Sequence, residues 1–247
     1  MATGYLHSME SLGTLDGPGI RTVFFLQGCP LRCHFCHNPD TQEFTQRQPI
    51  EPEEVLRLAG RYRPYYGEDG GVTFSGGEPL SQPAFVQEAL MLLKEEGYNT
   101  CIDTSGVASP KAVKKMLPYI DRFLLDIKDF TPEAFEELTS VKMRHLHNFF
   151  QTILEGEFEG KIWIRHVMMP GRTDNEEDMD KLVKVIEPLR PWIDRIEILP
   201  YHVMGVDKYK ELGRTYALEG MPAMDKAKAK ELEAYARKQF FGEEHVA

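Results

Sequence analysis

Short apolar segments alternate with helical patterns along almost the whole chain of 247 residues, and this alternation constrains the fold more than any other feature. The segments rich in β-branched and aromatic residues, which predict strands, are 21–26, 71–75, 98–104, 122–127, 161–167 and 195–199. Helical patterns begin at Pro52 and at Ser109, and others cover about 83–96, 131–154 (as two helices), 175–189 and 222–240. Six β/α units in this order predict a parallel sheet with right-handed crossovers.

Polar residues collect at the carboxyl ends of the predicted strands, where α/β proteins place their sites. Periodicity does not distinguish an open doubly wound sheet from a barrel. A ring of polar residues drawn from all six strands nevertheless favours a curved, barrel-like sheet. Beyond a cysteine loop after the first strand, the ring comprises Gly76, Gly77, Glu78, Asp103, Thr104, Asp126, Lys128, Arg165, His166 and His202.

Composition narrows the class of protein. No repeat, low-complexity segment or linker divides residues 1–247, so we expect one domain, with the segment 1–20 and the helix 222–240 packed on the barrel. No apolar run approaches the roughly 20 residues of a membrane span, and the first residues do not resemble a signal peptide. Four cysteines, three of them clustered, favour the reducing cytoplasm over a disulfide framework. A net charge of −10 argues against nucleic-acid binding.

Three of the four cysteines, Cys29, Cys33 and Cys36, lie within eight residues, directly after the first predicted strand. Thiolates on one short loop can converge on a soft metal centre such as an iron–sulfur cluster. A structural zinc site usually has four protein ligands, which His7, His34 or His37 would have to complete here. A redox disulfide would leave one cysteine unpaired. Three local ligands favour a cluster with one iron open to another molecule.

A second motif, Ser75-Gly76-Gly77-Glu78-Pro79, ends the second predicted strand. Its glycines allow positive φ angles and the close approach of backbone N–H groups to a ligand. A Gly-Gly turn between strand and helix is also commonplace. Its position one β/α unit after the cysteine loop favours a role in binding.

Together, these motifs resemble those of the radical S-adenosylmethionine superfamily, whose mark is C-x3-C-x-aromatic-C, here with Phe35 as the aromatic residue, followed by a Gly-Gly-Glu-Pro turn. The segment 13–21 resembles the opening of the glycyl-radical-enzyme activases within that superfamily. The similarity continues through 101–104, 125–128, 163–165 and 199–202. Several such activases carry a second, ferredoxin-like cysteine set. Its absence between Cys36 and Gly76 favours the type that acts on pyruvate formate-lyase.

The resemblance implies a partial (β/α)6 barrel, open on one side. It also implies one [4Fe-4S] cluster on Cys29, Cys33 and Cys36, whose fourth iron chelates S-adenosylmethionine. The residues that would contact this cofactor are Phe35, Cys36, His37, Gly77, Asp126, Ile127, Lys128 and His202. The positions that match a monovalent-cation site are Asp103, Thr104 and Asp126.

Among four further residues, Arg165 and Asp16 admit two interpretations, and His166 and Cys101 admit one each. Arg165 is either an inward contact to the cofactor, which we favour, or a surface ion-pair partner, and His166 should point to the opposite face of its strand. Asp16 is either a turn residue or a contact to the substrate. Cys101 lies in an apolar strand and is expected to be a core residue.

The activity implied by the resemblance is reductive cleavage of S-adenosylmethionine to methionine and a 5′-deoxyadenosyl radical, which takes the Cα hydrogen from a glycine of pyruvate formate-lyase or a related glycyl radical enzyme. Flavodoxin or another low-potential reductant would supply the electron, and the activase would be a monomer. Two alternatives remain open at this point: a radical S-adenosylmethionine enzyme that acts on a small molecule, and a non-catalytic zinc or iron–sulfur binding module.

Overall fold

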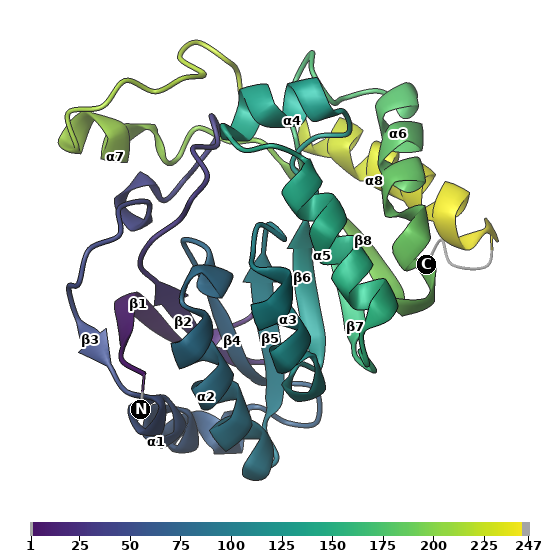
Figure 1. The fold of residues 1–247 in the computed structure, drawn as a ribbon. Coiled ribbons are helices and arrows are strands. Elements are labelled where there is room, and N and C mark those ends of the chain that lie inside the picture. The colour runs from purple at the N-terminus through teal and green to yellow at the C-terminus, as the bar shows by residue number, and fades with distance from the viewer. Residues whose placement is uncertain (1, 244–247) are drawn as a thin grey trace.

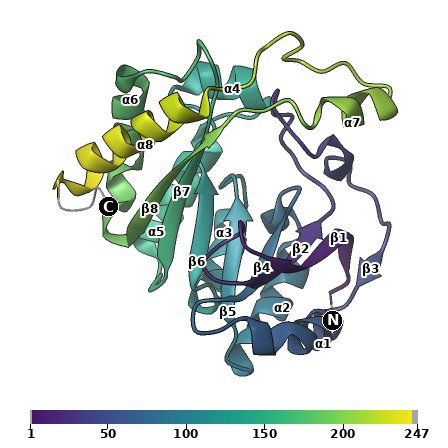
Figure 2. The ribbon, with the colours of Figure 1, turned by 180° about the vertical axis from the view of Figure 1, so that it is seen from behind.

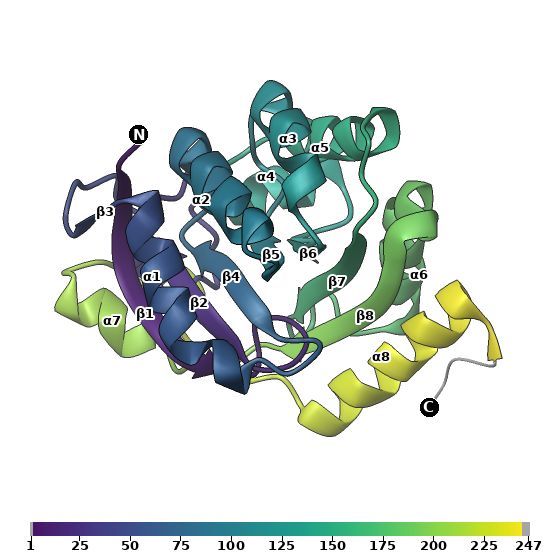
Figure 3. The ribbon, with the colours of Figure 1, turned by 90° about the horizontal axis from the view of Figure 1, so that it is seen from below.

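The computed structural model describes residues 2–243, and its centre is one eight-stranded sheet. The strands are β1 (Gly4–Gly13), β2 (Arg21–Leu26), β3 (Pro49–Ile50), β4 (Gly71–Gly76), β5 (Asn99–Thr104), β6 (Arg122–Asp126), β7 (Lys161–Met168) and β8 (Ile193–Pro200). Their order is β3-β1-β2-β4-β5-β6-β7-β8, with β2 and β4 to β8 parallel and β1 antiparallel to β2. Viewed from below, the sheet forms an open arc (Figure 3). The predicted partial barrel of six parallel strands is confirmed.

Helices follow the parallel strands, and all of them except the short helix Val206–Glu211 cover the outer face of the arc (Figure 1). They are α1 (Pro52–Tyr62), α2 (Pro83–Glu95), α3 (Pro110–Met116), α4 (Pro132–Thr139), α5 (Arg144–Glu155), α6 (Glu176–Ile186), α7 (Val206–Glu211) and α8 (Lys226–Phe241). Side chains cap several of them. Thr131 accepts from the backbone N–H of Ala134 at α4, and Asn175 accepts from that of Asp178 at α6.

The burial pattern of the strands shows which part of the sheet is covered on both faces. Strands β2, β4, β5 and β6 are buried on both faces over most of their length, as in a sheet that is covered on both sides. Strand β7 instead alternates buried and half-buried residues. Helix α8 packs along β8 at the other end of the sheet from β1 (Figure 2), and its Glu233 accepts from the edge N–H of Ile198. No helix within the described residues is long and apolar enough to cross a membrane.

The structure corrects the predicted elements at four places. The segment 1–20 contains the strand β1, which was missed because irregular pairing between Leu6 and Ser8 and again between Glu10 and Gly13 removes the period of two. Helix α7 within the loop after β8 was also missed. Helix α8 begins after Asp225, whose carboxylate caps it, rather than at 222. Helix α6 ends at Ile186, and a 3-10 helix over Glu187–Trp192 replaces its last turn.

Candidate active site

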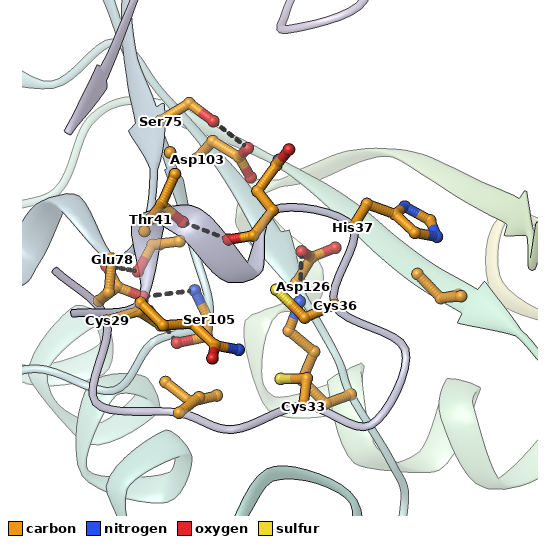
Figure 4. A pocket seen from close by; sticks show the side chains of 18 of the residues that line it. Cys29, Cys33, Cys36, His37, Thr41, Ser75, Glu78, Asp103, Ser105 and Asp126 are labelled. Carbon is orange, nitrogen blue, oxygen red and sulfur yellow. Dashed lines mark hydrogen bonds and ion pairs between the residues drawn. The ribbon is translucent and has the colours of Figure 1, made fainter. Parts of the chain in front are cut away.

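A cavity of about 260 Å³ lies at the carboxyl ends of the parallel strands and gathers most of the predicted site residues. Figure 4 shows Cys33 and Cys36 near Asp126, with Cys29 across from them beside Glu78 and Ser105. The predicted residues that line it are Asp16, Cys29, Cys33, Phe35, Cys36, His37, Gly77, Asp103, Thr104, Asp126, Lys128 and Arg165. Residues far apart in the sequence therefore meet in one place, as the strand-end argument predicts.

Backbone hydrogen bonds hold the cysteine loop on both sides. The N–H groups of Arg32 and His34 donate to the carbonyls of Thr139 and Leu138 at the end of α4. The N–H of Cys29 donates to Gln42 after the 3-10 turn Pro39–Thr41. The loop is therefore preorganised by two separate parts of the chain.

The three thiols are buried in this cavity. Burial is the main reason that the pKa values of Cys29 and Cys33 rise to about 12, and that of Cys36 is raised as well. Thiols in such surroundings stay protonated unless a metal displaces the proton.

A four-iron cluster and a single metal ion require different spacings of the thiols. Within residues 2–243, no three His, Cys, Asp or Glu side chains are placed to bind one metal ion. Two thiolates on one zinc ion lie only about 3.8 Å apart, given Zn–S bonds of about 2.3 Å. A four-iron cluster takes each cysteine on a different iron and so accepts a wider spacing.

Glu78 anchors the Gly-Gly turn. It is fully buried, and its carboxylate accepts hydrogen bonds from the backbone N–H of Leu80 (3.1 Å), the Thr104 hydroxyl (2.8 Å), and the N–H (2.9 Å) and hydroxyl (2.6 Å) of Ser105. Burial still raises the pKa of Glu78 above its usual value, while these four donors oppose the rise. Glu78 thus ties the turn after β4 to the end of β5.

The Gly-Gly turn itself lies against the end of β2, just before the cysteine loop. Gly76 has a φ of +105°, and a Cβ on Gly77 would collide with the backbone of Gly28. The glycines are therefore required by close backbone approach, which leaves the strand end open toward the cavity.

Opposite charges meet on the far wall of the cavity. The Lys128 ammonium lies 2.7 Å from Asp126, and an Arg165 guanidinium nitrogen lies 3.6 Å from Asp103. Burial opposes ionisation of Asp126, but Lys128 and Arg165 outweigh it and hold the pKa of Asp126 below its usual value. For Asp103 burial prevails and raises the pKa, even though Arg165 opposes the rise. Arg165 faces inward, as the favoured interpretation predicts.

Some polar atoms on this wall have no hydrogen-bond partner in the described chain, namely Asp126 Oδ1 and Arg165 Nε and Nη1. Arg165 reaches Glu197 only at 3.8 Å, which is too long for a hydrogen bond. An unpaired carboxylate oxygen and unpaired guanidinium N–H groups beside an ammonium fit the amino and carboxylate groups of an amino acid. The residues present therefore fit S-adenosylmethionine next to a cluster.

His37 and His202 form one side of the entrance. Their rings stack with centroids 3.8 Å apart, and a His37 ring nitrogen lies 3.1 Å from the His202 carbonyl oxygen. Burial and then the neighbouring His202 lower the pKa of His37 to about 4, so the ring is neutral at pH 7. His202 lies outside the first cavity and lines an adjoining one of about 480 Å³, which shares His37 and Arg165 with it.

Ile127 is a predicted contact whose side chain does not line the cavity. Its side chain is fully buried in the hydrophobic core and does not line the cavity. Its backbone is used instead: the N–H donates to the Arg165 carbonyl, and the carbonyl lies 2.7 Å from Nδ1 of the buried His166. Alternation along β7 thus points Arg165 into the cavity and His166 to the outer face, as expected. Cys101 is buried in the core, also as expected.

Sequence reasoning missed Arg21, the first residue of β2. Its guanidinium is fully buried and donates to the carbonyls of Pro18, Asp69, Val72 and Asn99 and to two side chains. One of these side chains is Thr73, which donates in turn to the Asp16 carbonyl at 2.7 Å. Arg21 therefore holds the Asp16 loop at the lower end of the cavity. The only available signal was a charged residue within an apolar strand.

Comparisons with known proteins agree with this site. The sequence model described as the radical SAM superfamily matches residues 23–183. A pyruvate formate-lyase-activating enzyme of Clostridium pasteurianum is 42% identical over 238 residues, covering 96% of this chain and 98% of that protein. A pyruvate formate-lyase-activating enzyme of Staphylococcus aureus strain USA300 is 41% identical over 233 residues, covering 91% of this chain and 92% of that protein.

Solved structures share the fold at lower identity. A domain of a pyruvate-formate lyase-activating enzyme from Bacteroides vulgatus superposes with a TM-score of 0.52 at 21% identity, covering 68% of this chain and 94% of that one. SuiB of Streptococcus suis, solved with its precursor peptide SuiA, gives a TM-score of 0.63 at 19% identity and covers 89% of this chain and 45% of that one.

Proposed function

The chain belongs to the radical SAM superfamily, and from that premise we propose that it activates pyruvate formate-lyase by generating a radical on one of its glycines. The observation that carries the proposal is the meeting, in one cavity, of three thiols with the unpaired polar atoms of Asp126 and Arg165. When bound, the cluster and S-adenosylmethionine supply a one-electron cleavage whose product removes hydrogen from a glycine Cα.

The residues of this chain would bind and orient these groups. Cys29, Cys33 and Cys36 would hold three irons. Lys128 and Arg165 would pair with the cofactor carboxylate. The cofactor amino group would donate hydrogen bonds to the backbone of Gly77 and to the free Asp126 oxygen. The nucleoside would lie against Phe35, His37 and His202, since His37 lines both cavities and stacks on His202, which lines the adjoining one. Asp16 would contact the glycine-bearing segment.

We also propose a monovalent cation near Asp103, Thr104 and Asp126. Four carboxylates, those of Asp16, Glu78, Asp103 and Asp126, line the cavity together with the two cations Lys128 and Arg165. The Thr104 hydroxyl is already bonded to Glu78, so its carbonyl is the better ligand. An oxygen-rich site with excess negative charge suits a hard cation.

The remaining partners follow from the chemistry. We propose that flavodoxin or a comparable low-potential carrier supplies the electron to a monomeric enzyme. The three thiols are unpaired in the structure and must stay reduced to bind iron, which supports a cytoplasmic location.

The test compares Cys36→Ala with the matched control Cys101→Ala after anaerobic reconstitution. The Cys36 variant should lose cluster absorbance and cleavage of S-adenosylmethionine, whereas the control should keep both. Wild-type protein mixed with pyruvate formate-lyase should give a glycyl signal in electron paramagnetic resonance. Full cleavage activity in the Cys36 variant would refute the cluster assignment. Cleavage without any glycyl signal would instead favour a small-molecule substrate.

A further inference from the structure

The segment after β8, from Tyr201 to Met224, forms a rim beside the entrance to the active site. It exposes two neighbouring apolar side chains, Val203 (47% exposed) and Met204 (78% exposed). Met204 lines the same adjoining cavity as His202, so this rim is continuous with the catalytic opening. Adjacent exposed apolar side chains next to a site are a common mark of a protein contact.

A hollow of about 420 Å³ lies next to Val203 and is separate from both catalytic cavities. Its apolar lining comprises Val203, Val206, Tyr216, Leu218 and Met221. Tyr216 and Leu218 form a buried floor, whereas Val203 is exposed at the edge. The hollow is thus a preformed seat for a side chain of moderate size.

Hydrogen bonds connect the segment to the rest of the protein, so this exposure is a property of the folded protein. The Tyr201 and Tyr216 hydroxyls lie 2.9 Å apart, and the Met224 N–H donates to the Tyr201 carbonyl. Lys208 donates to Asn38, and Arg214 donates to the Pro39 carbonyl. Both contacts reach the turn directly after the cysteine loop. Helix α7 accordingly lies near that turn in Figure 1.

The charges at the edge of the hollow are acidic. Asp207 and Glu219 line it, and both are exposed. Asp207 pairs with Lys210 at 3.1 Å, but both side chains are at least 75% exposed, and such a surface pair contributes only about 0–1 kcal/mol. Within residues 2–243, Glu219 has no ion-pair partner. An incoming cation would therefore meet two available carboxylates.

We propose that this hollow is a second docking site for the protein substrate, which seats an apolar side chain followed by a basic residue outside the glycine-bearing segment. The proposal rests on the proposed function, since it assumes that the substrate is a protein large enough to touch the catalytic opening and the rim together. Apolar contact in the hollow provides affinity, and the acidic edge selects the basic neighbour. An acidic electron carrier does not fit this edge.

Two variants test the docking site: Glu219→Lys at an exposed residue and Met221→Asp at a half-buried one. The matched control is Leu154→Asp, which adds a charge at another exposed apolar residue, on α5. Each protein is assayed as the reconstituted holoenzyme on intact pyruvate formate-lyase and on a short peptide that carries only its glycine segment. We expect both variants to raise KM for the intact protein about tenfold and to leave KM and kcat for the peptide unchanged.

An unchanged KM for the intact protein in both variants would overturn the proposal. An equal rise for peptide and protein would also overturn it, because the effect would then lie in the catalytic opening. If the variants change only how the rate depends on flavodoxin concentration, the hollow binds the electron carrier. If they change the oligomeric mass, the hollow binds a second copy of the chain. Either result refutes the proposal. Failure of the proposed function is separate, since wild-type protein would then give no glycyl signal on either substrate.

Discussion

Glu78 allows a quantitative test of how the Gly-Gly turn is held. Its carboxylate accepts four hydrogen bonds from buried donors. The substitution Glu78→Gln keeps the volume but replaces one carboxylate oxygen with an NH2 group, which cannot accept. The oxygen that serves Ser105 accepts from its backbone N–H and its hydroxyl, whereas the other serves Leu80 and Thr104.

The expected cost follows from the donors that lose their acceptor. The hydroxyl of Ser105 can rotate, but its backbone N–H cannot, and an unsatisfied buried donor costs about 1–3 kcal/mol. If the amide is flipped, the Leu80 N–H is orphaned in its place. In a domain of this size, 1 kcal/mol shifts Tm by about 2–4 °C, so Tm should fall by about 2–12 °C.

Thermal unfolding of the apoprotein, followed by circular dichroism under anaerobic conditions, measures this shift. The control is Glu68→Gln, at an exposed position on the α1–β4 connection, where Tm should stay within about 1 °C. The holoenzyme of Glu78→Gln should also show a higher KM for S-adenosylmethionine because the turn is less firmly placed. Equal Tm values for Glu78→Gln and wild type would refute the reasoning that this carboxylate anchors the turn.

Three further predictions concern the loops around the cavity. Burial and then Asp103 raise the pKa of Asp16 to about 6. KM for the glycine peptide should therefore fall as pH rises through about 6, and this inflection should vanish in Asp16→Asn. Because the folded state retains the proton to higher pH than the unfolded chain, the contribution of Asp16 to stability should decline as pH rises from about 4 to about 6. In Gly205→Ala the new Cβ would lie 2.8 Å from His37 Cα, at an ordinary φ of −84°, so this variant should raise KM for S-adenosylmethionine. The control Gly213→Ala has a φ of +65° and open space around the new Cβ, so it should affect only stability. Arg21→Met should lower the free energy of unfolding, measured by chemical denaturation, by more than about 3 kcal/mol, because it leaves several buried carbonyls without a donor. A loss of less than about 1 kcal/mol would contradict that account.

Sequence alone predicted the features that depend on local pattern. Each parallel strand is a short apolar run between turn residues, so its residues indicate it directly. The cysteine loop and the Gly-Gly turn were found because their spacing has a chemical meaning in itself. Their meeting in one cavity follows from the general rule that parallel strands end at the same edge.

The features that were missed depend on contacts between distant segments. Strand β1 is stabilised by pairing with β2 and β3, which its own sequence does not encode as a period of two. The role of Arg21 requires carbonyls from three separate stretches of chain, at Pro18, at 69–72 and at Asn99. The side chain of Ile127 lies in the core although its sequence neighbours Asp126 and Lys128 line the cavity, and the sequence alone did not separate the orientations of these three residues.

The two ends of the cavity are stabilised by different kinds of contact. At the lower end, a buried hydrogen bond joins Arg21 to Thr73, and a partly buried one joins Thr73 to the Asp16 carbonyl and so fixes the Asp16 loop. At the upper end, the segment containing α7 is tied to the cysteine loop region by Lys208 and Arg214, whose side chains are partly exposed. Exposed pairs contribute little and reform easily. Movement that admits a protein substrate should therefore occur at the upper rim, while the Asp16 loop should stay fixed.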